Sequence, residues 1–278
     1  MSVTGGAVPT GAPWTQWVWR NAVGGLAAIV RPARATVRPL LRTHMLALAG
    51  AVVVIAILMV TTDARVAVLV KDAPEWLRNV FDEITDFGKS GWLLWPLGVA
   101  LLAIAALASP ALTQASRLVL AMTAVRLGFL FTAIAIPGLF STVIKRLIGR
   151  ARPLVRPDPD PFLYAPFVWR ADHASLPSGH ATTVFAAAVA FSLVCPRLRV
   201  PFALYAILIC VTRVVLDAHY MSDVVAGAVV GTVGALLIRD WFAARRLGFS
   251  VDADGCVRTL PGPSFARIRR AVREAFTR

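Results

Sequence analysis

Six apolar runs dominate the pattern of hydrophobic and polar positions along the chain. Each is close to the ~20 residues that a helix needs to cross a bilayer, and their small and aliphatic residues suit close helix packing in lipid. Uncovered backbone is not tolerated in hydrocarbon, so helices are the expected form. The runs lie at 44–61, 91–108, 126–146, 179–195, 200–217 and 222–239. The pattern predicts an all-α, polytopic membrane helix bundle with six transmembrane helices.

The composition agrees with this architecture. The 278-residue chain is 58% hydrophobic and only 16% charged, whereas a soluble domain carries about 25% charged residues. Three scattered cysteines, Cys195, Cys210 and Cys256, indicate neither a disulfide framework nor a zinc site.

The distribution of arginine predicts the orientation of the chain. The net charge is +14, but five arginines and no acid lie in 1–43, and nine arginines against four acids follow Ile238. Basic ends that flank apolar runs indicate contacts with anionic lipid headgroups and not with nucleic acid. Arg117 in the second loop and Arg197 and Arg199 in the fourth lie on the same side as both ends. The positive-inside rule makes that side, with the N- and C-termini, cytoplasmic.

The expected layout has three parts: a basic N-terminal cytoplasmic segment (1–43), a six-helix membrane domain (44–239) and a basic C-terminal cytoplasmic tail (240–278). The N-terminal segment is too long for a cleavable signal peptide, so the first span should remain as an anchor. The first outward loop contains APEWLRNVFDEITDFG. Its apolar residues recur at helical spacing and predict an amphipathic helix on the outer leaflet.

The third loop is an exception to this charge distribution. It should face outward, yet it carries Lys145, Arg146, Arg150, Arg152, Arg156 and Arg170. The first notable motif begins here, with Lys145, six residues and then Arg152-Pro153 in KRLIGRARP. Lys145 lies 19 residues after Arg126, about 28 Å along a helix, so one residue is expected at each membrane surface. Taken alone, Lys145 and Arg152 could simply extend to lipid headgroups.

The second motif opens the fourth apolar run, in the stretch SLPSGHATT. Pro177 cannot continue a preceding helix, and Ser178 is a good N-cap for a helix that begins near Gly179. A helix start has unpaired N–H groups and a partial positive charge, which favour an anion. Gly179 has no side chain, so a phosphate oxygen could approach its N–H, and His180 follows in the first turn. An ordinary capped helix with a chance histidine is the alternative.

The third motif joins the fifth and sixth runs, in TRVVLDAHYMSD. It consists of Arg213, five residues, His219, three residues and Asp223. On a helix, side chains four residues apart share a face, so His219 and Asp223 could form a hydrogen bond. A carboxylate on one imidazole nitrogen fixes the tautomer and leaves the other nitrogen free to attack. A structural His–Asp pair is the alternative.

Together the three motifs place cations, two histidines and a carboxylate at the outer ends of spans, which predicts a phosphate site. They resemble the signature of the type 2 phosphatidic acid phosphatase superfamily: Lys-x6-Arg-Pro, Pro-Ser-Gly-His and Ser-Arg-x5-His-x3-Asp. Thr212 replaces the serine of the third motif and keeps its hydroxyl. The motifs extend from Lys145 to Asp223, and the six-helix layout extends the resemblance over most of the chain, leaving out 1–43 and the tail.

The resemblance implies a role for each residue. His219 would attack phosphorus and form a phosphohistidine, held by Asp223, while His180 would protonate the leaving oxygen and later activate water. A neutral His219 and a protonated His180 predict a bell-shaped pH profile. No metal and no other cofactor are implied. The phosphoryl oxygens would be bound by Lys145, Arg152, Ser178, Gly179 and Arg213.

We therefore expect an integral-membrane phosphatase that acts on a membrane lipid at the periplasmic face of a bacterial inner membrane. The candidate substrates are undecaprenyl diphosphate, phosphatidylglycerophosphate or phosphatidate, and lipid A 1-phosphate. A lipid phosphotransferase with the same site is the alternative. An anion transporter is a remote one, because the spans carry little charge and show no repeat. The oligomeric state is left open.

Two further expectations concern the surroundings of the site. Vanadium-dependent haloperoxidases have a similar signature, but those relatives are soluble, which argues against them for a chain with six apolar runs. The long third loop is expected to shape access to the site. Its polar residues Asp158, Asp160, Asp172 and His173 are expected to be solvated, with contacts to a sugar or glycerol headgroup as the alternative.

Overall fold

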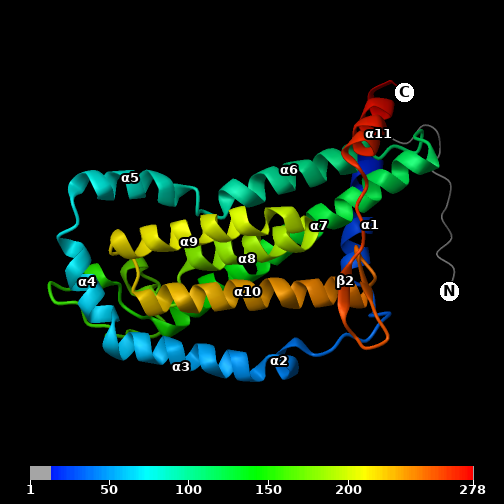
Figure 1. Ribbon diagram of the computed structural model, residues 1–278. Helices are drawn as coiled ribbons and strands as arrows, with labels where there is room; N and C mark the ends of the chain where they lie inside the picture. The colour runs from blue at the N-terminus through cyan, green and yellow to red at the C-terminus, as the bar shows by residue number, and fades with distance from the viewer. Residues whose placement is uncertain (1–13, 278) are drawn as a thin grey trace. The chain divides into compact units, whose positions relative to one another are not determined.

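The computed structural model describes residues 14–277, which are mostly helical (Figure 1). They form two compact units. Unit 1 consists of 14–37, 96–128 and 241–277, and unit 2 of Arg38–Trp95 and Phe129–Asp240. Residues 1–13 of the predicted basic N-terminal segment, and residue 278 of the predicted tail, lie outside the described residues. The three-part layout expected from the sequence stays a prediction.

The elements follow one another along the chain without long gaps, apart from the loop between α7 and α8. In order they are α1 (Trp14–Val30), α2 (Leu40–Thr43), α3 (Met45–Thr61), α4 (Asp63–Lys71), α5 (Glu75–Asp86), α6 (Gly91–Leu107), α7 (Gln114–Ile148), the 3-10 helices η1 (Pro153–Val155) and η2 (Ala171–His173), α8 (Gly179–Val194), η3 (Pro196–Leu198), α9 (Arg199–Val215), α10 (Met221–Ala244), β1 (Phe249–Val251), β2 (Val257–Thr259) and α11 (Phe265–Thr277).

Helix α8 lies at the centre of unit 2. Half of its 16 residues are buried, because its many alanines let neighbouring helices approach closely. Its main partner is α9, and Ile84 of α5 packs against the same cluster. Phe191 of α8 and Phe202 of α9 stack with their ring centroids 4.5 Å apart. The buried residues of this cluster are Ala181, Val184, Ala188, Ala206, Ile209, Cys210 and Val224.

Two glycines bring α10 against the first turns of α8. A Cβ at Gly227 would collide with the backbone oxygen of Ser178, and one at Gly231 would collide with that of Thr182. Small residues four apart allow this kind of backbone approach between helices. The N-terminus of α8, which belongs to the second motif, is thus held by the helix that carries Asp223 of the third.

Helix α7 is longer than the apolar run that predicted it. It continues unbroken for 35 residues although Pro137 lies inside it, which corresponds to about 52 Å. Arg117 was expected in a loop, but it lies within α7. Arg126 also lies within α7, and its expected position at a membrane surface stays a prediction. The expected loop is wrong because an apolar run marks contact with lipid, whereas a helix ends where its backbone hydrogen bonds end.

The structure supports four or five of the six predicted spans by length and composition. Four segments within the described residues qualify outright: Glu75–Leu107, Gln114–Ile148, Pro196–Val215 and Met221–Ala244. A fifth would be the pair α3 and α4, which is bent by 54° at Thr62. The run at 179–195 forms α8, which is apolar but shorter than a usual span. The chain is therefore a multi-pass membrane protein, while the count of six stays a prediction.

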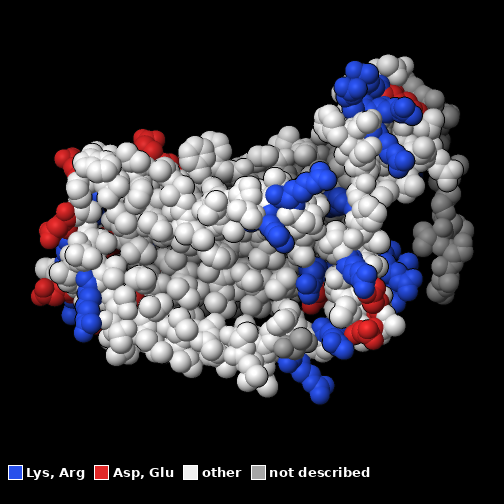
Figure 2. Space-filling model, in the orientation of Figure 1, with Lys and Arg blue, Asp and Glu red and all other residues white. Residues whose placement is uncertain are grey.

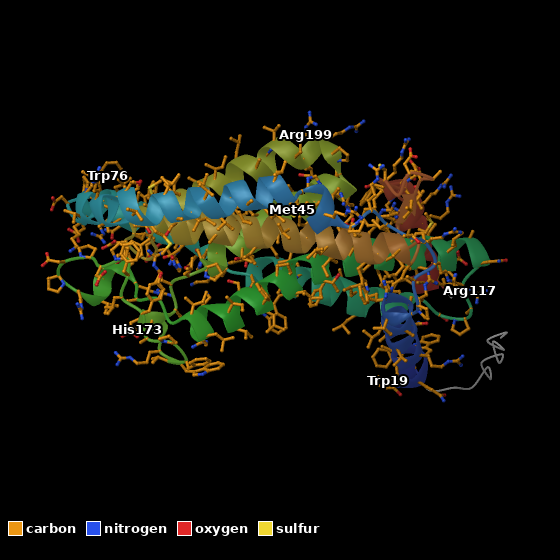
Figure 3. All side chains as sticks on the ribbon, turned by 90° about the horizontal axis from the view of Figure 1, so that it is seen from below. Trp19, Met45, Trp76, Arg117, His173 and Arg199 are labelled. Atoms are coloured by element: carbon orange, nitrogen blue, oxygen red, sulfur yellow. The ribbon has the colours of Figure 1, made fainter. Side chains whose placement is uncertain are left out.

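The charged side chains of unit 2 gather away from its middle. Figure 2 shows an almost uncharged surface along α3, α9 and α10, with acidic and basic side chains around α4 and α5. His173 and Trp76 lie at that same end of unit 2, and Arg199 lies away from it (Figure 3). An uncharged band between charged ends is typical of helices surrounded by lipid.

The amphipathic helix predicted in the first outward loop is present as α5. Its apolar side is divided: Ile84 packs on the α8–α9 cluster, while Trp76 and Val80 are exposed. The structure therefore makes α5 a cover for α9 as well as a surface helix. Its position on the outer leaflet stays a prediction.

The predicted tail has structure of its own in unit 1. Strands β1 and β2 pair antiparallel around a turn that contains Gly255 at φ 75°. In α11, Ala271 packs on Leu112 and Leu120, and the Glu274 carboxylate accepts hydrogen bonds from Thr113 and Ser116. The all-α expectation is therefore corrected by one short hairpin, which the apolar pattern did not predict.

Candidate active site

The three motifs meet at the N-terminus of α8. The N–H of Ser178 donates to the backbone oxygen of Asp223 (2.9 Å), which joins the second motif to the third. Lys145 reaches the same place from α7, because its Nζ lies 2.9 Å from where a Cβ on Gly179 would stand. Both predicted site arginines lie within electrostatic range of this lysine. The structure thus brings together all eight predicted residues: Lys145, Arg152, Ser178, Gly179, His180, Arg213, His219 and Asp223.

Ser178 occupies the N-cap position, but its side chain does not cap the helix. Its backbone is extended (φ −65°, ψ 121°) and no hydrogen bond runs from its hydroxyl to the first turn. Within residues 14–277, the buried Ser178 Oγ has no hydrogen-bond partner. The capping role expected for this hydroxyl is therefore wrong. A free hydroxyl beside the unpaired N–H groups of a helix start is suited to binding the oxygens of an anion.

Two arginines near the N-terminus of α8 have N–H donors without partners. The Nε atoms of Arg152 and Arg213 are buried and have no hydrogen-bond partner in the described part of the chain. Arg213 is anchored through Nη1, which donates to Thr85 Oγ1 (2.9 Å). Burial lowers the pKa of Arg152 even though Asp223 and Asp172 raise it. Buried guanidinium donors without partners are costly unless an acceptor binds them.

His180 lies in the first turn of α8 beneath the end of α5. A Cβ on Gly88 would come within 2.9 Å of His180 Cδ2, so this turn covers one side of the imidazole. His180 Nε2 is buried and, among the described residues, has no hydrogen-bond partner. The second histidine therefore also has an unused polar atom.

His219 precedes α10 instead of lying on it, because that helix begins at Met221. The expectation that His219 and Asp223 share a helix face is therefore wrong, but the two side chains still form a long ion-pair contact. His219 Nδ1 and Asp223 Oδ2 are 3.8 Å apart, too far for a hydrogen bond. The loop is held at α9 because the N–H of His219 donates to the Arg213 oxygen (3.3 Å).

His219 is only 3% exposed, which sets its protonation state. Burial lowers the pKa of His219 to about 4, although the nearby Asp223 opposes this shift. The imidazole is therefore neutral at pH 7, the form in which a ring nitrogen has a lone pair for attack. Nδ1 makes the polar contacts of the ring, which leaves Nε2 for a substrate.

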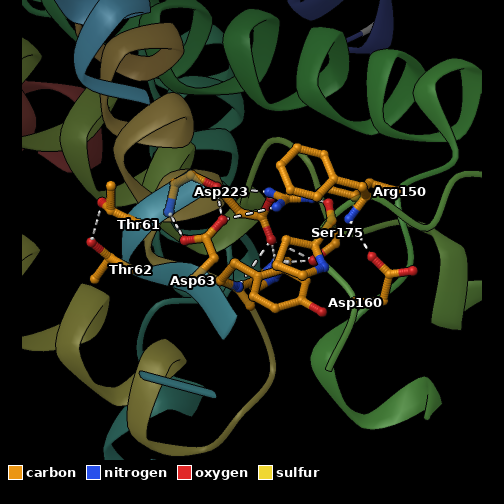
Figure 4. A network of polar contacts seen from close by, with 12 residues as sticks. Thr61, Thr62, Asp63, Arg150, Asp160, Ser175 and Asp223 are labelled. Atoms are coloured by element: carbon orange, nitrogen blue, oxygen red, sulfur yellow. Dashed lines mark hydrogen bonds and ion pairs between the residues drawn. The ribbon is translucent and has the colours of Figure 1, made fainter. Parts of the chain in front are cut away.

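Three polar residues that the sequence analysis did not select connect to this pair. Ser175 Oγ lies 2.5 Å from Asp223 Oδ2 and 3.3 Å from His219 Nδ1. Arg150 forms an ion pair with Asp223 (2.5 Å) and another with Asp63 (2.8 Å). These side chains point toward one another from α4, the loop after α7 and the segment before α8 (Figure 4). Their sequence signal is weak, because a serine, an arginine and an aspartate are ordinary residues near helix ends.

The long loop between α7 and α8 folds back on its own beginning. The N–H of Ala165 donates to the Gly149 oxygen (2.8 Å), and that of Ser175 donates to the Arg150 oxygen (3.1 Å). Gly149 has φ 67°, and a Cβ there would collide with the backbone of Ala165. Glycine is therefore required at this crossing.

The polar residues of that loop differ in their contacts. Asp172 pairs with Arg170 (2.6 Å) and with His173 Nδ1 (3.1 Å), and its backbone oxygen accepts a hydrogen bond from the N–H of Arg152. Asp160 accepts one from the N–H of Phe162 (2.9 Å), and Asp158 is exposed. Pairing with neighbours in the loop accounts for Asp160 and Asp172, and contacts with a headgroup stay a prediction.

The fold and these contacts define a multi-pass helical membrane protein with a buried, cationic, two-histidine site at a helix N-terminus. Residues 126–247 match the PAP2 superfamily. The chain is 36% identical over 202 residues to a lipid A 1-phosphatase of Rhizobium etli, which covers 72% of this chain and 86% of that protein. It is 38% identical over 184 residues to a lipid A 1-phosphatase of Rhizobium johnstonii. That alignment covers 66% of this chain and 75% of the Rhizobium johnstonii protein.

Among solved structures, the crystal structure of LpxE from Aquifex aeolicus is similar, with 21% identity and a TM-score of 0.45 over 63% of this chain and 93% of that one. The sequence relatives carry the assignment: the chain belongs to the PAP2 superfamily. This confirms the type 2 phosphatidic acid phosphatase superfamily indicated by the three motifs and, at this level, the expectation of a membrane-bound lipid phosphatase.

Proposed function

We propose that this phosphatase hydrolyses the 1-phosphate of lipid A at the periplasmic face of a bacterial inner membrane, through a phosphohistidine at His219. The observation that carries the proposal is the set of buried, unpartnered polar atoms around the N-terminus of α8: Ser178 Oγ, His180 Nε2 and the Nε atoms of Arg152 and Arg213. A tetrahedral dianion would supply acceptors for the hydroxyl and both guanidinium groups, and the histidine would stand beside its leaving oxygen.

The proposed chemistry gives each of the two histidines one role. His219 Nε2 attacks phosphorus, the bond from phosphorus to the leaving oxygen breaks, and that oxygen takes the proton of His180. Water then attacks the phosphohistidine and gives its proton to His180, the N–P bond breaks, and phosphate leaves. Lys145, Arg152 and Arg213 neutralise the equatorial oxygens at both stages, with Ser178 and the N–H of Gly179 completing the set of donors. No step needs a metal ion.

The relatives and the location of the site support lipid A as the substrate. Two relatives that share more than a third of their aligned residues with the chain are named lipid A 1-phosphatases. A site at one end of apolar helices suits a phosphate whose acyl chains stay in the bilayer. Lipid A therefore stands ahead of undecaprenyl diphosphate, phosphatidylglycerophosphate and phosphatidate.

The proposed topology has six spans, with both termini in the cytoplasm. Counting α8 as the short fourth span puts the three motifs on one side of the membrane, and Arg197 and Arg199 on the other with the basic termini. The anionic headgroups of the inner leaflet would then meet the arginines of the N-terminal segment and of the tail.

Phosphate release by the detergent-purified protein tests the reaction and the substrate together. The panel contains lipid A with its 1-phosphate, undecaprenyl diphosphate, phosphatidylglycerophosphate and phosphatidate. We expect release from lipid A to exceed release from the others, and His219→Ala to abolish it. His44→Ala is the matched control, since His44 is exposed and takes no part in the site. Activity that survives His219→Ala would contradict the mechanism, and a preference for another lipid would contradict the substrate.

A second measurement separates hydrolysis from transfer. Lipid labelled at the 1-phosphate should yield free phosphate, and a rapid quench should trap label on the protein in an acid-labile form that His219→Ala lacks. Label that appears on a second lipid instead would make the protein a phosphotransferase.

The topology can be tested with cysteine labelling. Cys256 is exposed, whereas Cys195 is half-buried and Cys210 buried. In a Cys195→Ala background, a membrane-impermeant maleimide should label Cys256 in inverted vesicles only. A Cys256→Ala, Asp72→Cys variant should be labelled in right-side-out vesicles only, because Asp72 ends α4 on the side of the site. The reverse pattern would contradict the proposed orientation.

A further inference from the structure

A buried polar network adjoins the site and is distinct from the residues that face the substrate. Its centre is Arg150, whose side chain is fully buried. Three of its nitrogens donate hydrogen bonds: Nε to the Pro161 oxygen (2.9 Å), Nη1 to Asp223 Oδ1 (2.5 Å) and Nη2 to Asp63 Oδ2 (2.8 Å). The Tyr220 ring lies against the guanidinium, 4.5 Å from ring centroid to Cζ. Arg150 therefore has no free face for a phosphate.

Asp63 ties this network to the first apolar helix. It is the first residue of α4 and is 1% exposed. Its carboxylate accepts hydrogen bonds from the Ser222 N–H (3.0 Å) and the Ser222 hydroxyl (2.5 Å) as well as from Arg150. Ser222 directly precedes Asp223, so Asp63 fixes the backbone at the start of α10 from a position 159 residues earlier in the chain.

Ser175 bridges the long contact between His219 and Asp223. Its hydroxyl donates to Asp223 Oδ2 (2.5 Å), so the remaining lone pairs of Oγ can accept the Nδ1–H of His219 (3.3 Å). The Tyr220 N–H also donates to Asp223 Oδ2 (3.0 Å). The contacts run from His219 Nδ1–H through Ser175 to Asp223, and from Asp223 through Arg150 to Asp63.

The charges of this network favour the attacking form of His219. Within the network two carboxylates pair with one guanidinium. Of the charges that act on the ring from outside its loop, Asp223 raises the pKa of His219, whereas Arg152 and Arg213 of the phosphate site lower it. As Nε2 forms its bond to phosphorus, the imidazole becomes positively charged while Nδ1 keeps its proton. A fixed negative charge in a buried site stabilises that positive charge more than it would in water.

We propose that Ser175, Arg150 and Asp63 are positioning residues for His219: Ser175 holds the Nδ1–H tautomer, and the Arg150–Asp63 pair keeps the Asp223 carboxylate in place beside the ring. The inference rests on the proposed nucleophilic role of His219. No proton is transferred along the chain of contacts, since the Nδ1 proton remains on the ring through attack and hydrolysis.

The test compares three variants in the detergent-purified full-length protein. Ser175→Ala removes the bridge, Asp63→Asn removes one charge at nearly constant shape, and Arg150→Lys keeps the charge but loses the planar fork. We expect kcat to fall on the order of 10- to 100-fold for Ser175→Ala, by analogy with the loss of a residue that orients a metal-bound histidine, and by a smaller factor for the other two. KM should change less than twofold, because none of the three faces the phosphate. Ser175→Thr, which keeps the hydroxyl, should recover part of kcat.

The pH profile separates positioning from simple loss of structure. Asp63→Asn removes negative charge near His219 and should move the acid limb of kcat/KM to lower pH, whereas partial unfolding would lower activity without moving the limb. Asp72→Asn is the matched control, since Asp72 is an exposed aspartate at the other end of α4 and should leave kcat and the profile unchanged.

The outcomes distinguish this inference from the proposed function. If His219→Ala is inactive while Ser175→Ala and Asp63→Asn keep the wild-type kcat, the positioning inference is overturned and the nucleophile stands. If His219→Ala remains active, the proposed mechanism itself fails, whatever the other variants do. A rise in KM with unchanged kcat would also overturn the inference, because it would assign these residues to substrate binding.

Discussion

Arg150 and Arg152 stand two residues apart in KRLIGRARP, yet the structure gives them opposite surroundings. Arg150 donates to two carboxylates, a serine hydroxyl and a backbone oxygen. Arg152 lies beside Lys145 and Arg213, other cations, and its buried Nε has no partner among the residues described. One arginine is already neutralised by the protein, and the other is available to neutralise something else.

The pKa shifts follow the same division. Burial alone would lower the pKa of Arg150, but Asp223 and Asp63 raise it overall. For Arg152 burial prevails and the pKa is lowered. A buried cation whose nearby carboxylates do not offset its burial is a candidate for ligand binding, whereas one held in ion pairs contributes to the fold. Charge and sequence position alone do not separate the two cases, and partners do.

The largest expected effect is on stability. Arg150→Ala would leave Asp63 and Asp223 buried without their cation, and breaking a buried ion pair in this way costs about 3–5 kcal/mol. Thermal unfolding in detergent should show a large fall in Tm. The same change at Arg152 should leave Tm unchanged or raise it, because it relieves repulsion from Lys145 and Arg213. Equal losses at both positions would remove the distinction between the two arginines.

The second effect is on catalysis, where we expect Arg152 to matter directly, whereas stability depends on Arg150. Arg152→Ala removes a donor proposed to bind the phosphoryl oxygens, and loss of one such donor lowers kcat about 10²- to 10³-fold. Phosphate release from the preferred lipid is the measurement. Arg156→Ala is the matched control, since Arg156 is an exposed arginine of the same loop and should keep nearly full activity. A comparable loss at Arg156 would point to a general effect of charge.

The sequence predicts the helices and the residues proposed to contact the phosphate, because both depend on local patterns. Apolar runs located α3, α6, α8, α9 and α10 to within a few residues, and fixed spacings identified the residues around the N-terminus of α8. The network behind His219 and Asp223 depends on contacts between residues that are distant in the sequence. Asp63 and Arg150 are 87 residues apart, and Ser175 and Asp223 are 48 apart, so no window along the chain contains either pair.

Other differences have separate physical causes. The His219–Asp223 spacing of four matches a helix, but α10 begins between the two residues. The spacing therefore does not place them on one helix face. The tail hairpin had a local signal, since an Asp-Gly pair lies between short alternating segments in SVDADGCVRT, the composition of a tight turn. The long α7 had none, because polar residues such as Arg117 are as compatible with a helix as with a loop.

The acid limb of the pH profile tests whether burial keeps His219 neutral. Its pKa is lowered to about 4 by burial, from about 6.5 in an unfolded chain, so the nucleophile becomes neutral as the pH rises through 4. Above that pH kcat/KM should not depend on His219, and below it should fall about tenfold per pH unit. Stability should also decline as the pH falls from about 6.5 toward 4, since only the unfolded state takes up the proton there.

Nitrogen NMR of labelled histidine makes this measurement directly, because the chain has four histidines and His219→Asn identifies one resonance. A midpoint near 6.5 for that resonance would show that burial does not keep the ring neutral. Burial would then not determine the charge of the residue that is proposed to attack phosphorus.

The smallest expected effect comes from Gly179→Ala. The added Cβ would stand 2.9 Å from Lys145 Nζ, and the end of a flexible lysine can move aside at little cost to the fold. Tm should therefore be unchanged or slightly higher, since alanine favours a helix more than glycine does. The displaced ammonium and the methyl group would both stand where a phosphate oxygen approaches the helix N-terminus, so kcat/KM should fall about tenfold, the loss for roughly one weakened charge-assisted hydrogen bond. Alanine at Gly138, which faces open space on the exposed side of α7, is the control. A loss of Tm with intact activity at Gly179 would show that the lysine supports the helix and does not face a ligand.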